Sequence, residues 1–275
     1  MSPVWLVILG IISVQVGATI SKGLFGVIPP VGMVFLRLAT SSLVMLAVAR
    51  PRLRDRTLAD WRPVIALATA LGTMNWAIYE SFSRIPLGVA VTIEFVGPLL
   101  VAAFGSRRPR DFVWVGLAAL GITLFRAGPV KVEPIGFALA LVAGGCWAMY
   151  ILATVATGRR WAGIEGLAVA SAMATLALAP VAIASAGPRL LQPRLLLIGA
   201  AVGLLSSVIP YSVEMIALRT VPSRVFGILM SLEPAAAALA AAVLLREWLT
   251  PLQLAAMACV TAASVGAARG ENTPA

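Results

Sequence analysis

Four glutamates occupy hydrophobic stretches of this chain that are long enough to cross a membrane: Glu80, Glu94, Glu214 and Glu233. A carboxylate in the hydrocarbon layer costs at least ~2.5–3.5 kcal/mol on insertion scales, so such residues usually face an internal cavity on a substrate or proton path. Glu94 and Glu233 fall near the centres of their stretches, and each precedes a proline by no more than four residues. The pattern therefore predicts a polar site at mid-depth in a membrane.

The two central glutamates suit one particular chemistry. A carboxyl group in a central cavity can exchange protons, which couples proton movement to substrate movement, and it can also pair with a substrate ammonium group. The alternative for Glu94 and Glu233 is a neutral glutamic acid that is hydrogen-bonded between helices. Glu80 and Glu214 lie near the ends of their stretches and rank lower, because they are expected to reach an interface or a vestibule.

Arg37 is the basic residue that lies well inside a hydrophobic stretch. Its guanidinium fork suits a substrate carboxylate, but a structural ion pair or a side chain that snorkels to the interface is the favoured alternative. Packing between helices is the alternative for each of the uncharged candidates for the cavity wall, which are Gln15, Asn75, Trp76, Tyr79, Thr92, Trp147, Tyr150, Ser206, Ser207 and Tyr211. Helical spacing predicts a shared face for Asn75, Trp76 and Tyr79 and another for Trp147 and Tyr150.

The elements that must position these residues are membrane spans. The chain is 60% hydrophobic and only 12% charged, whereas soluble domains carry about 25% charged residues. The apolar residues form blocks of a length that crosses ~30 Å of hydrocarbon. Ten such spans are predicted, at 4–24, 31–49, 63–82, 86–104, 112–127, 134–154, 164–184, 194–217, 223–245 and 251–268. The fold class is therefore an all-α integral membrane protein.

The net charge of +10 does not indicate nucleic-acid binding, because the basic residues lie in the links between spans. With the N-terminus inside, 13 of the 21 Lys and Arg residues fall in inner links, 7 fall at outer ends, and Arg37 lies in a span. Since positive charge concentrates on the cytoplasmic side, we expect a multi-pass protein of the bacterial inner membrane with both termini in the cytoplasm. Five tryptophans near span ends are expected to be interfacial anchors: Trp5, Trp61, Trp114, Trp161 and Trp248.

The two halves of the chain resemble each other at a fixed offset of 136 residues. The matches are Pro86 with Pro222, Pro98 with Pro234, Arg110 with Arg246, and Asp111 with Glu247. Each half, 1–130 and 131–275, then contains five spans, and an odd number of spans reverses the direction of the chain. We therefore predict two inverted five-helix repeats, a plan in which transporters place their site between the halves near the midplane.

Enzymatic functions are disfavoured by composition. The chain contains no histidine, which excludes an HExxH metalloprotease, a Ser-His dyad and a histidine-ligated metal. It also lacks a GxxxxGK[ST] phosphate-binding loop. We therefore expect no enzyme activity, no metal and no cofactor, and an ion gradient is the energy source that remains.

Several strings in the chain resemble a known family. They include Met74-Asn75-Trp76, Glu94-Phe95-Val96-Gly97-Pro98, Cys146-Trp147-Ala148, Pro210-Tyr211-Ser212 and Ser231-Leu232-Glu233-Pro234. With these strings the chain resembles the drug/metabolite transporter superfamily, in its ten-helix EamA-type branch, over nearly its whole length.

The resemblance implies two inverted five-helix repeats around a central cavity and efflux of small neutral amino acids similar to threonine or homoserine, driven by the proton gradient. It implies functional positions at Glu94, Arg37, Asn75, Tyr211, Glu214 and Glu233, whereas Glu80 departs from the pattern. The expected partners are an amino acid, protons and the lipid bilayer. The alternatives are a broad-specificity metabolite or drug exporter of the same fold and, from a different class, a passive channel or a lipid scramblase.

Overall fold

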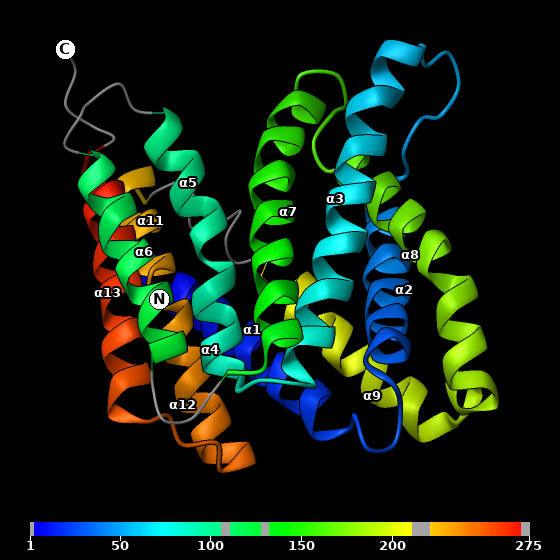
Figure 1. The fold of residues 1–275 in the computed structure, drawn as a ribbon. Helices are drawn as coiled ribbons and strands as arrows, with labels where there is room; N and C mark the ends of the chain where they lie inside the picture. The colour runs from blue at the N-terminus through cyan, green and yellow to red at the C-terminus, as the bar shows by residue number, and fades with distance from the viewer. Residues whose placement is uncertain (1–2, 106–110, 128–131, 211–220, 271–275) are drawn as a thin grey trace.

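The computed structural model describes residues 3–105, 111–127, 132–210 and 221–270, which form helices joined by short links, with no β-strand among them (Figure 1). The elements of the first half are α1 (Pro3–Gly23), α2 (Pro30–Ala49), α3 (Leu58–Phe82), α4 (Leu87–Glu94), α5 (Val96–Gly105) and α6 (Asp111–Ala127). Those of the second half are α7 (Pro134–Gly158), α8 (Glu165–Ala186), η1 (Gly187–Leu191), α9 (Pro193–Gly203), η2 (Leu204–Val208), α11 (Ser223–Met230), α12 (Glu233–Leu245) and α13 (Pro251–Gly270).

The helices have the lengths and composition of membrane spans. Six segments of the described chain are long and apolar enough to cross a bilayer, namely Val4–Gly23, Pro30–Ala49, Pro134–Gly158, Glu165–Leu191, Val225–Leu245 and Pro251–Arg269. Shorter apolar helices cover Leu87–Ala102, Phe112–Phe125 and Pro193–Val208. Every predicted span coincides with a helix, or with consecutive helices, over its described residues. The protein is therefore a multi-pass membrane protein.

Two of the predicted spans are broken in the middle, and the breaks match. The span at 86–104 divides into α4 and α5 at Phe95, and the span at 223–245 divides into α11 and α12 after Met230. Helices α4 and α11 are both eight residues long and follow a proline with nearly the same conformation, φ −56° and ψ 140° at Pro86 and φ −57° and ψ 141° at Pro222. The prolines that follow the breaks, Pro98 and Pro234, each remove a backbone hydrogen-bond donor from the helix.

Helices at equivalent positions in the two halves pack against each other in opposite directions. In Figure 1, α6 and α13 lie at one edge of the bundle and α2 and α8 at the other, with α3 and α7 between them. The start of α2 meets the end of α8, where Gly32 faces Ala186, and the α2–α3 link meets the start of α8, where Arg56 pairs with Glu165 at 3.0 Å. The small side chains of glycine and alanine allow the two helices to pack closely, as is common in membrane bundles.

The pair α6 and α13 is antiparallel in the same way. Trp114, near the start of α6, lies against Gly266, near the end of α13, and Gly121 lies against Ala256, near the start of α13. Each of these pairs joins helices that the 136-residue offset relates. The packing of the described helices is thus compatible with the repeat that the sequence predicts.

The end of the molecule that carries the start of α3 is held by polar contacts. Arg160 pairs with Asp60 at 3.2 Å, and the Trp161 indole N–H donates to the backbone oxygen of Asp60. Hydrogen bonds from Thr57 hold the pKa of Asp60 below its usual value, and together they form a capping box at the start of α3. The interfacial prediction for Trp161 is wrong, because its ring is buried beneath the Arg56 guanidinium.

Candidate functional site

A cavity of about 240 Å³ lies between the two halves and brings together most of the residues that the sequence singled out. It is lined by residues from seven helices and the π-helical turn η2: Val14, Gln15, Ala18, Arg37, Met74, Asn75, Ile78, Tyr79, Phe82, Val91, Glu94, Trp147, Tyr150, Ser206, Pro210, Met230 and Glu233. Its volume falls below the ~300–1,000 Å³ of pockets that take drug-sized ligands. A small solute therefore suits it better than a large one.

Helix α3 supplies one wall of the cavity. Its lining residues recur at positions that share one face of a helix, and they include the buried side chains of Asn75 and Tyr79. The amide nitrogen of Asn75 donates to the Leu71 carbonyl at 2.8 Å, which leaves the amide oxygen as the group that can accept from a solute. Trp76 is 36% exposed and is not among the lining residues, so the predicted face includes Asn75 and Tyr79 without it.

Arg37 enters the cavity from α2 and is held there by Tyr79. Its Nη1 donates to the Tyr79 hydroxyl at 2.9 Å, and its guanidinium carbon lies 5.3 Å from the centroid of the Tyr79 ring. Within the described residues, no acidic side chain lies within 4.0 Å of Arg37. Arg37 interacts electrostatically with Glu94 across the cavity rather than through a direct contact. The guanidinium lines the cavity, where a solute anion can reach it.

Glu94 lies at the last position of α4, next to the helix break. Pro98 has no N–H, so the Glu94 carbonyl oxygen loses its donor from the following turn. A Cβ at Gly97 would overlap the carbonyl oxygen of Gly144 on α7, and a Cβ at Gly144 would lie 2.8 Å from the Glu94 carbonyl oxygen. Two glycines thus let α7 approach the break at van der Waals distance. The Glu94 side chain is 9% exposed and lines the cavity.

The second break brings Glu233 and Met230 to the same cavity. Glu233 is the first residue of α12 and is 8% exposed, and Met230 is the last residue of α11. Both line the cavity. Met230 is the counterpart of Glu94 at the 136-residue offset, so the equivalent positions of the two halves face the same space. The sequence prediction missed Met230, although the repeat itself was the signal that points to it.

Unsatisfied polar atoms gather around this cavity. Four buried side-chain atoms of the described residues have no hydrogen-bond partner, and three of them are Gln15 Oε1, Arg37 Nε and Ser206 Oγ. Gln15, Arg37 and Ser206 all line the cavity. A buried polar atom without a partner costs ~1–3 kcal/mol. Their concentration at one place indicates a wall built to meet a polar solute or water.

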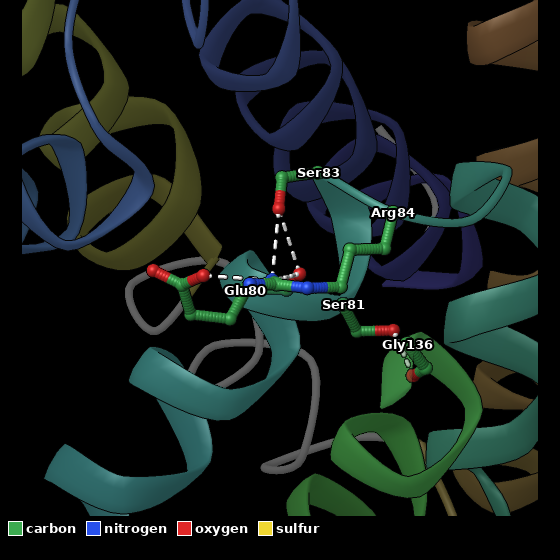
Figure 2. Close-up of polar contacts among 5 residues, drawn as sticks. All are labelled: Glu80, Ser81, Ser83, Arg84 and Gly136. Carbon is green, nitrogen blue, oxygen red and sulfur yellow. Dashed lines mark hydrogen bonds and ion pairs between the residues drawn. The ribbon is translucent and has the colours of Figure 1, made fainter. Parts of the chain in front are cut away.

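The remaining predicted site residues lie partly in the cavity wall and partly away from it. Trp147 and Tyr150 line the cavity from one face of α7, as their spacing predicts. Glu80 does not, because it lies near the end of α3 and pairs with Arg84 at 2.7 Å. Figure 2 shows this pair, with Ser83 beside it and Ser81 donating to the Gly136 carbonyl. Tyr211 and Glu214 lie outside the described residues.

Known proteins resemble this chain over nearly its full length. A model of the EamA-like transporter family matches residues 134–269. The chain is 43% identical over 272 residues to the threonine/homoserine exporter RhtA of Escherichia coli (strain K12), covering 96% of this chain and 92% of the relative. It is 44% identical over 275 residues to the exporter of the same name from Salmonella typhimurium (strain LT2), with the same coverage. A crystal structure covers 98% of this chain and 99% of its own with a TM-score of 0.65 and 18% identity, a likeness of fold alone.

Proposed function

The chain belongs to the EamA-like transporter family, and we propose that it exports small neutral amino acids of the threonine and homoserine kind from the cytoplasm. The names of relatives that are 43–44% identical over almost the whole chain support this substrate class. We further propose that export is exchange against protons.

The observation that carries the proposal is the charge pattern of the cavity. Arg37 brings a cation, and Glu94 and Glu233 bring carboxyl groups, into a single space of about 240 Å³. A zwitterionic amino acid carries one group of each sign. Arg37 is the proposed partner of the substrate carboxylate, since its planar fork matches that geometry. The glutamates are the proposed partners of the ammonium group.

Proton coupling follows from the same carboxyl groups. A glutamate that binds either a proton or an ammonium group, but not both, forces the two to alternate. Glu94 and Glu233 are proposed to carry this competition, and Gln15, Asn75, Tyr79, Trp147, Tyr150 and the undescribed Tyr211 are proposed to fix the solute. The lower-ranked Glu214, also outside the described residues, is proposed to line a vestibule. Glu80 pairs with Arg84 and is given no part in transport.

We propose that ten spans form two inverted five-helix repeats, 1–130 and 131–275, which rock against each other around the cavity. The antiparallel pairs α2–α8 and α6–α13 and the equal breaks after α4 and α11 support this plan. Alternating access by motion of one repeat against the other is the usual mechanism of such folds. The charge bias of the links supports an inner-membrane protein with both termini in the cytoplasm.

The proposal is tested by counterflow of labelled threonine and homoserine in proteoliposomes, with and without an imposed pH gradient. Saturable exchange that accelerates with the gradient is the expected result. If the protein is monodisperse and unfolds cooperatively on heating, yet exchanges neither solute, the substrate assignment is contradicted.

One observation favours the broad-specificity exporter as a second candidate: the cavity wall includes the aromatic rings of Phe82, Trp147 and Tyr150. Aromatic or cationic solutes that compete with threonine at similar concentrations favour it. A passive channel or a scramblase is excluded by counterflow that saturates.

A further inference from the structure

A partly buried ion pair closes one end of the bundle below the cavity. Lys22, near the end of α1, lies 2.6 Å from Glu247, which stands in the link between α12 and α13. The side chains of Lys22 and Glu247 are 14% and 24% exposed. Lys22 also contacts the link between α3 and α4, where its Nζ donates to the Ile85 carbonyl at 2.8 Å, and Glu247 accepts from the amide of Leu87, the first residue of α4, at 3.0 Å.

The local backbone is shaped to present Glu247 to this partner. Helix α12 ends in Arg246, whose φ of 58° is in the left-handed region that favours glycine. The Glu247 amide then donates back to the Ala241 carbonyl at 3.2 Å, and the Arg246 amide donates to the same carbonyl, so the backbone turns back over the last turn of α12. A left-handed non-glycine residue costs roughly 1–2 kcal/mol, and here the turn directs Glu247 over the end of α12 toward Lys22.

The three segments that meet at this ion pair come from both halves of the chain. Lys22 and the α3–α4 link belong to the first half, and Glu247 belongs to the second. A rocking motion that opens this end must therefore separate Lys22 from Glu247. By contrast, the Glu80–Arg84 pair at the same end joins residues of one helix end, four apart in sequence, and bridges nothing (Figure 2).

The ion pair is also connected to the cavity by two short routes. Leu87 begins α4, an eight-residue helix about 12 Å long that ends at the cavity residue Glu94. Ser21, the neighbour of Lys22, lies 3.4 Å from the Tyr79 hydroxyl, the group that accepts from Arg37. A displacement of Glu94 can therefore be transmitted to the ion pair through α4, and a displacement of Arg37 through Tyr79 and Ser21.

We propose that Lys22 and Glu247 form the latch that closes the cavity at the face opposite the N-terminus of α1. The inference rests on the proposed alternating-access function. When the latch is intact, the cavity is shut on that face. When the two halves separate there, Lys22 releases Glu247 and the Ile85 carbonyl together, and α4 is freed to move with Glu94.

The test measures access to the cavity directly and needs no transport. Ile78, which is buried and lines the cavity, is replaced by cysteine in a background in which Cys146 and Cys259 are alanine. A membrane-impermeant maleimide is applied to each face in turn, to intact cells and to inside-out vesicles. The variants are Lys22→Met, Glu247→Gln and the reversed pair Lys22→Glu with Glu247→Lys. Arg84→Met, which breaks the Glu80–Arg84 pair, is the matched control.

Each single variant is expected to raise the labelling rate from the face opposite the N-terminus on the order of tenfold, equivalent to about 1.4 kcal/mol. The reversed pair is expected to lower that rate only in part, because it restores the ion pair but sets a carboxylate against the Ile85 carbonyl and an ammonium against the Leu87 amide. Arg84→Met is expected to leave the rate unchanged. If the single variants fail to fold, Glu247→Asp decides by the same comparison of rates, because it keeps the charge but withdraws the carboxylate from Lys22 Nζ by one methylene.

Unchanged labelling in both single variants, or an equal increase in Arg84→Met, overturns the latch. The two proposals fail separately. Altered labelling in a protein that exchanges neither threonine nor homoserine removes the substrate assignment and keeps the latch. Normal exchange of threonine or homoserine with unaltered labelling removes the latch and keeps the substrate assignment.

Discussion

Arg37 and Tyr79 show how a single contact changes the interpretation of a charge in the membrane. The sequence singles out Arg37 as a cation inside a span, but its partner lies 42 residues away, beyond the reach of helical spacing. The hydrogen bond to Tyr79 holds the guanidinium beside the cavity. Residue types and their periodicity were thus sufficient to find Arg37, Asn75, Tyr79 and Glu94, whereas the contacts between spans depend on tertiary packing.

Replacing Arg37 by lysine tests its proposed contact with the substrate carboxylate. Lysine keeps the charge but loses the planar fork and its paired donors. We expect KM for threonine to rise about tenfold, or about 1.4 kcal/mol, with the maximal rate little changed. Weak inhibition by threoninol, which has no carboxylate, is expected to be the same in variant and parent. The exposed Arg62→Lys is the control, and an unchanged KM in Arg37→Lys contradicts the assignment.

Glu94→Gln removes the proton-exchanging group and preserves the shape of the side chain. Since glutamine cannot alternate between a proton and an ammonium group, we expect the pH gradient to lose its effect on threonine counterflow, a decrease of at least about tenfold in gradient-driven uptake. The comparison is Glu80→Gln, whose carboxylate lies outside the cavity and pairs with Arg84. Full, gradient-dependent uptake in Glu94→Gln would remove Glu94 from the coupling mechanism.

At the scale of elements, Pro98 and Pro234 follow the two breaks, but the sequence predicted continuous spans there and did not predict what packs against the breaks. Pro98 has no N–H and leaves the Glu94 carbonyl without its donor from the following turn. The approach of α7 to that carbonyl depends on Gly97 and Gly144, which lie 47 positions apart and show no local pattern. The burial of Trp161 was missed for the same reason, because the Asp60 carbonyl that binds its indole lies about 100 residues earlier.

Two adjacent glycines on α7 offer a matched test of this packing. A Cβ at Gly144 would lie 2.8 Å from the Glu94 carbonyl oxygen, whereas a Cβ at Gly145 meets nothing within 4 Å. We expect Gly144→Ala to lower the thermal midpoint by an overpacking cost of ~1–3 kcal/mol and to impair counterflow. Gly145→Ala is expected to retain both, with a small gain from helix propensity. Equal midpoints for the two variants would contradict the close approach.

At the scale of the molecule, the antiparallel pairs α2–α8 and α6–α13 connect the repeat in the sequence to a mechanism. The offset of 136 residues was readable from four matches, two of them prolines, which act on the backbone as no other residue type does. The relative orientation of the halves followed only from counting five spans in each. In the structure, Gly32 meets Ala186 and Arg56 meets Glu165, so the equivalent helices α2 and α8 run in opposite directions.

Cysteines at equivalent positions of the two halves test the inversion directly. Leu53, after α2, and Arg189, after α8, are related by the same offset, and both are exposed. If the halves are inverted, an impermeant maleimide labels Arg189→Cys in intact cells and Leu53→Cys only in inside-out vesicles, each in a background with Cys146 and Cys259 replaced by alanine. The expected preference is at least about tenfold in opposite directions, because a polar reagent does not cross the hydrocarbon layer. Labelling of both cysteines from one face would place equivalent links on the same side, and a carrier that rocks two inverted halves would then be untenable.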